Sequence, residues 1–297
     1  MKDELLKLLV ENNDKKVVEK ESNGVEKNVE VKIEKNNTVE SDTKADSNIL
    51  DSFDEDDFNE DFSEDVIKEI YSIYGRKGSG KTFVALSWPG EKLVLSFDKK
   101  AYRTKKLYQM LFGEEKAKEI KIVDVLKYMD YTDENSILET SNKSWEYLNH
   151  VIKKYSGKFD WIIIDGTEIL TQLTENVMRY KFGCSLYGGV KLQYWKMRKD
   201  LIIGFFNTCV SSSKKGVIYT TYTDKDEIII DGEIVEKTEV PKWIEYVSQV
   251  TDVLIHTYKK DNRYYAKVVS SKLMMPEKTY DVTNKLFYEE VMKDVRG

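Results

Sequence analysis

The stretch from Gly75 to Thr82 constrains this chain more than any other, because it reads G-R-K-G-S-G-K-T. This order matches the phosphate-binding loop pattern G-x-x-x-x-G-K-T, whose glycines let several backbone N–H groups converge on one anion. Four of the five residues 70–74 are β-branched or aromatic and predict a strand before the loop, and residues 82–86 suit the start of a helix. The sequence therefore predicts a strand–loop–helix unit that binds a nucleotide.

The loop assigns a role to its own side chains. Lys81 is expected to reach the β- and γ-phosphates, and the hydroxyl of Thr82 is expected to bind Mg²⁺. The N-terminus of the following helix adds its dipole to the anion site. The predicted nucleotide-binding residues are Gly75, Arg76, Lys77, Gly78, Ser79, Gly80, Lys81 and Thr82.

A second motif supplies an acid. Residues 159–166 read F-D-W-I-I-I-D-G, and a continuous apolar run of this kind predicts a strand buried on both faces of a parallel sheet. Open α/β sheets bind their ligands at the carboxyl ends of the strands. In P-loop NTPases an acid at such an end holds the magnesium shell opposite the loop threonine. Asp165, 84 residues after Lys81, is the expected metal acid.

Charge divides the chain into two parts. Residues 1–65 hold 21 acids and 9 bases, a balance of −12, whereas the remainder holds 32 acids and 38 bases, a balance of +6. The first part has few large apolar side chains and predicts a disordered acidic tail. Within it, residues 51–65 hold nine acids and three phenylalanines, a composition that suits a solvated linker or an arm that docks on a protein partner. The folded domain is expected to span residues 66–297.

Several features bound the class of protein. The longest apolar runs are far shorter than the roughly 20 residues that cross a bilayer, and the first residues lack a signal-peptide pattern. We therefore expect a soluble, intracellular protein. Alternation and turn signals predict further strands at 92–97, 120–125 and 216–221, helices at 102–118, 144–155, 190–210, 242–250 and 282–295, and hairpins at 227–236 and 253–270.

Together these motifs resemble the RecA-like ATPases, especially the small core-only relatives of RecA and RadA encoded by phages, archaeal viruses and plasmids. The resemblance covers residues 66 to about 280 and is carried by the phosphate loop, the strand ending in Asp98, the strand ending in Asp165, and residues 249–255 and 266–272. It implies an α/β fold: a RecA-like P-loop core with a mostly parallel central sheet and a C-terminal hairpin. It also implies ATP and Mg²⁺ as cofactors.

The resemblance implies further catalytic residues. Lys272 falls on a lysine that reaches the nucleotide of the neighbouring subunit in the family, whereas Ser270 replaces a second such lysine. A solvent-facing lysine at a strand end is the alternative. Lys100 stands where the family usually has the glutamate that orients the attacking water, so Asp98 or Glu168 is expected to take over that role.

The family's DNA-binding loops follow the strands of the metal acid and of the polar sensor, here Thr221 or Thr223. The first loop corresponds to residues 175–199, where lysines and arginines alternate with tyrosines and a tryptophan. Cations for phosphates and flat rings for bases suit single-stranded DNA, although a solvated helix face has the same composition. The second loop corresponds to residues 224–239 and is mostly acidic, which argues against a second contact of this kind.

We expect an oligomeric ATPase that acts on single-stranded DNA in recombination, annealing or replication. A viral genome-packaging or helicase motor is one alternative, because its phosphate loop would read the same. A nucleotide-dependent switch that binds a protein partner and has no DNA activity is another.

The charge split gives a first prediction. If residues 51–65 cover a basic surface of the domain, deleting residues 1–65 tightens single-stranded DNA binding at low salt, and the difference shrinks as salt screens the charges. A salt titration of DNA affinity for the full-length and truncated chains measures this. Equal affinities at low salt would reject the autoinhibitory role.

Overall fold

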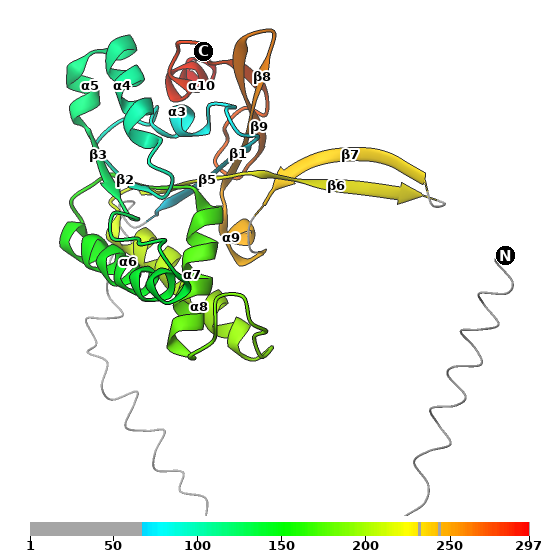
Figure 1. Ribbon diagram of the computed structural model, residues 1–297. Coiled ribbons are helices and arrows are strands. Elements are labelled where there is room, and N and C mark those ends of the chain that lie inside the picture. Colours follow the sequence, from blue (N-terminus) through cyan, green and yellow to red (C-terminus); the bar gives the residue numbers. More distant parts are fainter. Residues whose placement is uncertain (1–66, 231–232, 243–244, 297) are drawn as a thin grey trace, which may run out of the picture. The chain divides into compact units, whose positions relative to one another are not determined.

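The computed structural model describes residues 67–230, 233–242 and 245–296 (Figure 1). The predicted acidic tail lies outside these residues. The strands are β1 (Glu69–Gly75), β2 (Lys92–Ser96), β3 (Ile120–Asp124), β4 (Trp161–Asp165), β5 (Gly216–Thr221), β6 (Thr223–Ile230), β7 (Glu233–Pro241), β8 (Val253–Lys260), β9 (Arg263–Ser271) and β10 (Thr279–Asp281). The helices are α3 (Lys81–Ala85), α4 (Ala101–Phe112), α5 (Glu114–Lys118), α6 (Glu134–Tyr155), α7 (Thr167–Lys181), α8 (Tyr194–Ser212), α9 (Glu245–Val250) and α10 (Phe287–Arg296).

One large sheet organises the domain. Its strand order is β10-β9-β8-β1-β5-β4-β2-β3, and β8, β1, β5, β4, β2 and β3 run parallel to one another. β9 pairs antiparallel with β8, and β10 pairs antiparallel with β9. β6 and β7 form a separate antiparallel pair. The parallel strands all end at one edge, so the segments that follow β1, β2, β4 and β5 meet there.

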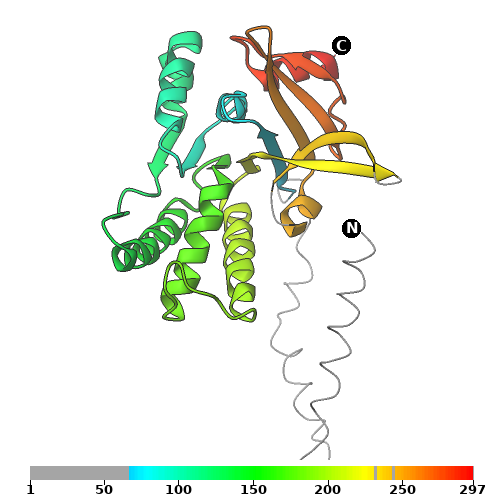
Figure 2. The ribbon, with the colours of Figure 1, turned by 45° about the vertical axis from the view of Figure 1, so that its right-hand side comes forward.

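Helices cover both faces of the sheet. Figures 1 and 2 show α3, α4, α5 and α10 on one side, with α6, α7, α8 and α9 on the other. β4 shows how the sequence meets both layers, because Ile163 packs in one hydrophobic cluster while Ile162 and Ile164 pack in the second. The unbroken apolar run of β4 follows from this double burial.

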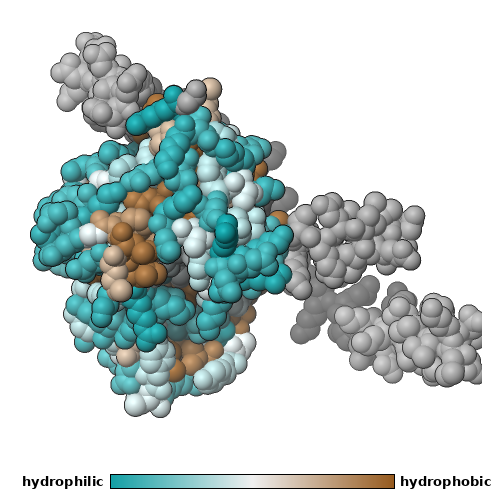
Figure 3. All heavy atoms as spheres, turned by 90° about the horizontal axis from the view of Figure 1, so that it is seen from above, coloured by the Kyte–Doolittle hydropathy of each residue, from teal (hydrophilic) through white to brown (hydrophobic). Residues whose placement is uncertain are grey.

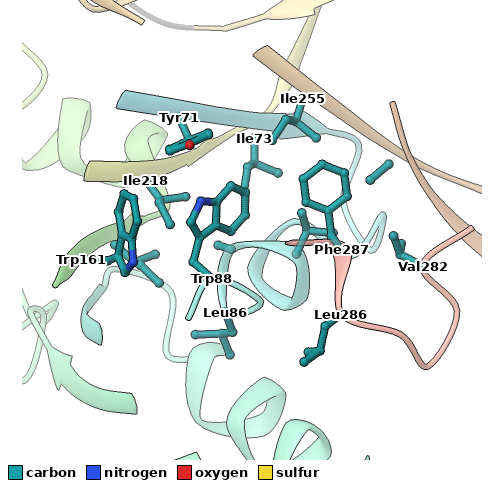
Figure 4. Close-up of a cluster of buried hydrophobic side chains, with 14 of the residues drawn as sticks. Tyr71, Ile73, Leu86, Trp88, Trp161, Ile218, Ile255, Val282, Leu286 and Phe287 are labelled. Carbon is teal, nitrogen blue, oxygen red and sulfur yellow. The ribbon is translucent and has the colours of Figure 1, made fainter. Parts of the chain in front are cut away.

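The core beside α3 is aromatic. Trp88 is fully buried, and its ring centroid lies 4.8 Å from that of Tyr71 and 5.7 Å from that of Phe287 (Figure 4). Trp161 packs on the other edge of Tyr71 at 5.8 Å. These contacts join the short α3 segment to the sheet and to α10, and so they hold the helix that begins at the phosphate loop.

The expected fold class is confirmed: the domain is α/β, with a large, mostly parallel central sheet and a C-terminal hairpin. The predicted strands and both hairpins are present, and β8 and β9 join through Asp261 and Asn262, which both have positive φ. Such a pair suits a tight two-residue hairpin turn. The turn of the β6–β7 hairpin lies outside the described residues.

Several helix predictions were wrong in extent. α6 begins at Glu134, ten residues before the predicted start, because Asp133 caps it by accepting from Ser136 N. The predicted helix at 102–118 divides at Gly113, whose φ of 90° ends α4. The last helix begins at Phe287, and the preceding residues include β10, which the sequence analysis did not predict.

Within the described part of the chain, no helix has both the length and the hydropathy needed to cross a membrane.

Candidate functional site

The predicted phosphate loop connects β1 to α3. Gly78 and Gly80 have φ values of 80° and 93°, in the left-handed region that favours glycine. A Cβ at Gly75 would lie 2.3 Å from the carbonyl oxygen of Thr257, so the start of the loop needs glycine for its approach to β8. The geometry therefore explains the two glycines that the loop pattern fixes, Gly75 and Gly80, and Gly78 is a third glycine that this loop requires.

Neighbouring strands brace the loop through polar contacts. The hydroxyls of Ser79 and Thr257 lie 2.7 Å apart in a buried position. Arg76 Nε donates to Glu239 Oε1 at 2.6 Å, and Glu239 Oε2 lies 2.9 Å from His256 Nε2. The loop is therefore tied to β8 and to the end of β7.

The carboxylate of Asp165 lies across from the loop at the end of β4. Its side chain accepts hydrogen bonds from Thr82 Oγ1 at 2.9 Å and from Thr220 Oγ1 at 2.8 Å. Asp165 is only 3% exposed. Burial raises its pKa to about 6, the Asp98 charge adds to the increase, and the two threonine hydroxyls and Lys81 oppose it.

The ammonium of Lys81 is folded back onto its own loop. Nζ donates to the carbonyl oxygens of Gly75 at 2.7 Å and Arg76 at 3.1 Å, and it lies 4.3 Å from the ring centroid of Tyr222. Burial lowers the pKa of Lys81 to about 8, although Glu168 and Asp165 act in the opposite direction. Carbonyl oxygens and a ring face thus hold this cation beside the phosphate site.

The two candidate water-orienting acids differ in their surroundings. Asp98 accepts from the backbone N–H of Lys100 at 3.0 Å and pairs with its ammonium at 2.8 Å. Glu168, in the first turn of α7, accepts from Thr221 Oγ1 at 3.0 Å and from the backbone N–H of Tyr222. Among the described residues, no salt bridge joins Glu168 to a lysine or arginine, so its negative charge has no paired cation.

These groups line one cavity of about 400 Å³. Its polar wall is formed by the loop, Asp98, Lys100, Asp165, Glu168 and Thr220. The rest of its lining is mostly apolar and aromatic, and it includes Phe83, Leu107, Leu111, Tyr222, Tyr264 and Val282, with the polar Asn284. A phosphate-binding loop next to an aromatic wall suits a ligand that has both a phosphate chain and a flat ring.

The residues at the loop fit Mg²⁺ carried in with a nucleotide. Within the described ranges, no cluster of three or more His, Cys, Asp or Glu residues could hold a metal ion alone. Thr82 and Asp165 offer two hard oxygen donors at one point. Mg²⁺ is commonly bound by one or two protein oxygens, with phosphates and waters completing its shell.

Two other predicted regions lie away from this cavity. Lys272 is exposed, does not line the cavity, and donates to the carbonyl oxygen of Gln249 at 3.1 Å. The region predicted as a DNA-binding loop, residues 175–199, is about half helical, because α7 continues to Lys181 and α8 begins at Tyr194, with the non-helical residues 182–193 between them. Arg179 in this region is buried and pairs with Glu175 at 2.9 Å.

The sequence analysis missed several residues of the cavity. Thr221 or Thr223 was expected as the polar sensor, but Thr220 is the residue that donates to Asp165. Thr221 donates to Glu168 instead. Thr223 does not line the cavity. Tyr222 and Tyr264 were also not predicted. Thr220 lies directly opposite Asp165 in the register of β5 with β4. Its position near the end of the predicted strand 216–221 is the sequence signal that could have identified it.

The two shifted pKa values predict a bell-shaped pH dependence of Mg²⁺-nucleotide binding. The Asp165 carboxylate loses its charge as the pH falls through about 6, and the Lys81 ammonium loses its charge as the pH rises through about 8. Calorimetric affinities between these limits should exceed those on either side. Asp165→Asn should remove the loss of affinity that the Asp165 carboxyl causes at low pH, while the part caused by protonation of the nucleotide itself remains. An unchanged pH profile would show that Asp165 does not bind the metal.

Comparisons with known proteins add little to this geometry. No family model matches the chain, and no curated protein matches it in sequence. Among solved structures, a crystal structure of the RadB recombinase is similar to this chain with a TM-score of 0.41 and 11% sequence identity. The match covers 73% of this chain and 88% of the RadB chain. The function is therefore inferred from the site itself.

Proposed function

We propose that this chain is a Mg²⁺-dependent RecA-like ATPase that acts on single-stranded DNA, as an oligomer, in recombination, annealing or replication. One observation carries the nucleotide part of the proposal. Lys81, Thr82 and Asp165 meet in one cavity, where Thr82 Oγ1 lies 2.9 Å from the Asp165 carboxylate. Loop, cation, hydroxyl and acid are the groups that a bound Mg²⁺-nucleotide requires.

Nucleotide binding should rearrange Lys81. Its ammonium now satisfies two loop carbonyls, and phosphate oxygens offer a stronger, charge-assisted partner. Mg²⁺, when bound, would neutralise part of the phosphate charge beside Thr82 and Asp165. The backbone N–H groups of the loop would then surround the phosphate chain, with the base against the aromatic wall of the cavity.

The orienting acid is proposed to be Glu168. A group that accepts a proton from water needs a free lone pair and an unpaired negative charge. Asp98 already pairs with the ammonium and the N–H of Lys100. Glu168 uses one oxygen for Thr221 and Tyr222 and lines the cavity. Tyr222 links Glu168 to the phosphate-binding cation, because its backbone N–H donates to Glu168 and its ring lies against Lys81 Nζ.

Lys81→Ala tests the central assignment. It removes the one cation that the loop motif places on the phosphates, so we expect ATP hydrolysis to fall by about 100-fold or more and nucleotide affinity to fall as well. Lys118→Ala is the control, because Lys118 is exposed on α5 and lies outside the cavity. Near-normal turnover of Lys81→Ala would refute the ATPase proposal.

A pair of isosteric changes separates the two acids. Glu168→Gln should lower kcat by about 100-fold while nucleotide binding remains, because the amide cannot accept a proton from water. Asp98→Asn should have the smaller effect on kcat, since Asp98 is already paired with Lys100. Single-turnover and binding measurements on both variants decide the matter, and the reverse order would assign the role to Asp98.

Oligomer formation is supported by an apolar surface near the cavity. Leu107, Met110 and Leu111 on α4 are 48%, 76% and 38% exposed, and hydrophobic residues gather on this face in Figure 3. Leu107 and Leu111 also line the cavity. A neighbouring subunit on this surface would bury exposed apolar area and approach the nucleotide. Lys272, exposed and outside its own cavity, is then a candidate contribution to the site of that neighbour.

Mixing two inactive variants tests Lys272. Lys272→Ala and Lys81→Ala subunits should together recover part of the ATPase activity, because some interfaces combine an intact loop with an intact Lys272. Subunit mixing is confirmed by labelling one variant. No recovery in confirmed mixed oligomers would leave Lys272 as a surface lysine.

For the DNA role, lysines on α7, on α8 and between these helices remain exposed, and Tyr187 between the helices is 85% exposed. Exposed lysines suit the phosphates of single-stranded DNA, and the exposed Tyr187 ring suits stacking with an unpaired base.

Stimulation of the ATPase by single-stranded DNA distinguishes this proposal from a protein-binding switch. Translocation on duplex DNA would instead favour the motor alternative.

A further inference from the structure

A second basic and aromatic surface lies at the edge of the sheet, away from the cavity. It is formed by β3, by the segment after β3, by α6 and by the turn that follows α6. We call it the Lys–Tyr surface, and its members are Lys121, Lys127, Tyr128, Lys143, Tyr147, Lys154, Tyr155 and Lys158. None of these residues lines the cavity at the phosphate loop. β3 is the last strand of the sheet, so this side has no further strand beside it.

The lysines of this surface are held against tyrosine rings. Lys127 Nζ lies 3.9 Å from the ring centroid of Tyr147 and 4.6 Å from that of Tyr128. Lys143 Nζ lies 5.1 Å from the Tyr128 ring, and the two rings meet edge to face at 5.2 Å. Cation–π contacts of this kind restrict the long lysine side chains, and they leave the ammonium N–H groups available to an anion.

A second group of lysines surrounds Tyr155. Lys121 Nζ lies 4.3 Å from the ring centroid, and the ammonium groups of Lys154 and Lys158 lie 5.8 Å and 5.7 Å away. Lys143, Tyr147 and Lys154 are spaced by four and seven residues, which places them on one face of α6. The face therefore joins the two groups over about 16 Å of helix.

Within the described ranges, no carboxylate pairs with the lysines of this surface. Among the described residues, no salt bridge involves Lys121, Lys127, Lys143, Lys154 or Lys158. By contrast, Lys285 and Lys293 near the C-terminus both pair with Glu290. The nearby Asp124 pairs with Lys99, and Glu146 on α6 accepts from Asn142. The hydrogen bond and charge of Lys121, together with the charges of Lys154 and Lys158, lower the pKa of Tyr155, whose ring is half-buried against the core.

We propose that the Lys–Tyr surface binds single-stranded nucleic acid, as a contact separate from residues 175–199. Unpaired lysine ammonium groups suit the phosphates of a nucleic-acid backbone, and the exposed ring of Tyr128 beside them suits stacking of an unpaired base. The half-buried Tyr147 and Tyr155 hold the lysines in place. The rings already order the lysines, so binding loses less side-chain entropy than it would with free lysines. The inference adds a binding surface to the proposed function and requires no hydrolysis.

A salt titration with matched variants tests this surface. The probe is a fluorescein-labelled oligothymidine, and its affinity is measured by anisotropy with the full chain between about 50 and 200 mM salt. Lys143→Gln with Lys154→Gln removes two positive charges from the surface. Lys285→Gln with Lys293→Gln removes the same charge near α10, which lies at the opposite end of the domain from α6 (Figures 1 and 2).

The surface predicts a loss specific to the first variant. Each lost phosphate contact lowers the slope of log affinity against log salt by about 0.7 for single strands, so Lys143→Gln with Lys154→Gln should lower it by about 1.4. Its affinity at the lowest salt should fall about tenfold or more, whereas the control should match the parent. Nucleotide affinity should be the same in all three proteins and reports that the fold is intact.

The other outcomes are distinct. Equal slopes in all three proteins would overturn the Lys–Tyr surface and leave the DNA role with residues 175–199. No binding of the probe by any of them would overturn the DNA role itself, whereas the ATPase proposal is tested by Lys81→Ala. Tighter binding of a duplex than of a single strand of the same length would overturn the assignment of unpaired bases as the ligand.

Discussion

The contact of Thr82 with Asp165 is the interaction on which the rest of the site depends. A carboxylate that is 3% exposed is costly unless hydrogen bonds or a cation stabilise it, and here two threonine hydroxyls supply those bonds. The sheet positions both threonines beside the carboxylate. Thr220 lies opposite Asp165 in the register of β5 with β4, and Thr82 lies in the first turn of the helix that follows β1. The order β1-β5-β4 in the sheet therefore brings loop, hydroxyl and acid together.

Burial gives the same groups their electrostatic character. It raises the pKa of Asp165 and lowers that of Lys81, so each charge is less stable than it would be in water. Mg²⁺ beside the acid and phosphate beside the lysine would each restore a favourable partner. A site of this kind favours its ligand because the free protein compensates the two charges only in part, through hydroxyls, loop carbonyls and the ring of Tyr222.

The sequence was most informative where local pattern and chemistry coincide. The loop needs glycine at positions of positive φ, and β4 needs an unbroken apolar run because both of its faces are buried. Both requirements could therefore be recognised in the sequence. Tyr222 and Tyr264 could not, since their place in the cavity depends on the pairing of strands far apart in the chain. The Lys–Tyr surface was missed for the same reason: Lys121 and Lys154 meet at Tyr155 only after β3 and α6 have packed. α6 starts earlier than predicted because Asp133 caps its N-terminus, and the amphipathic pattern did not indicate where the helix begins.

An experimental structure with Mg²⁺ and a non-hydrolysable ATP analogue tests the central claim most directly. The account predicts the phosphates within the loop of residues 75–82, and the metal beside Thr82 Oγ1 and the Asp165 carboxylate. It also predicts that Lys81 Nζ moves from the carbonyl oxygens of Gly75 and Arg76 onto the phosphates. A nucleotide bound elsewhere, or a metal with no contact to Thr82 or Asp165, would contradict it.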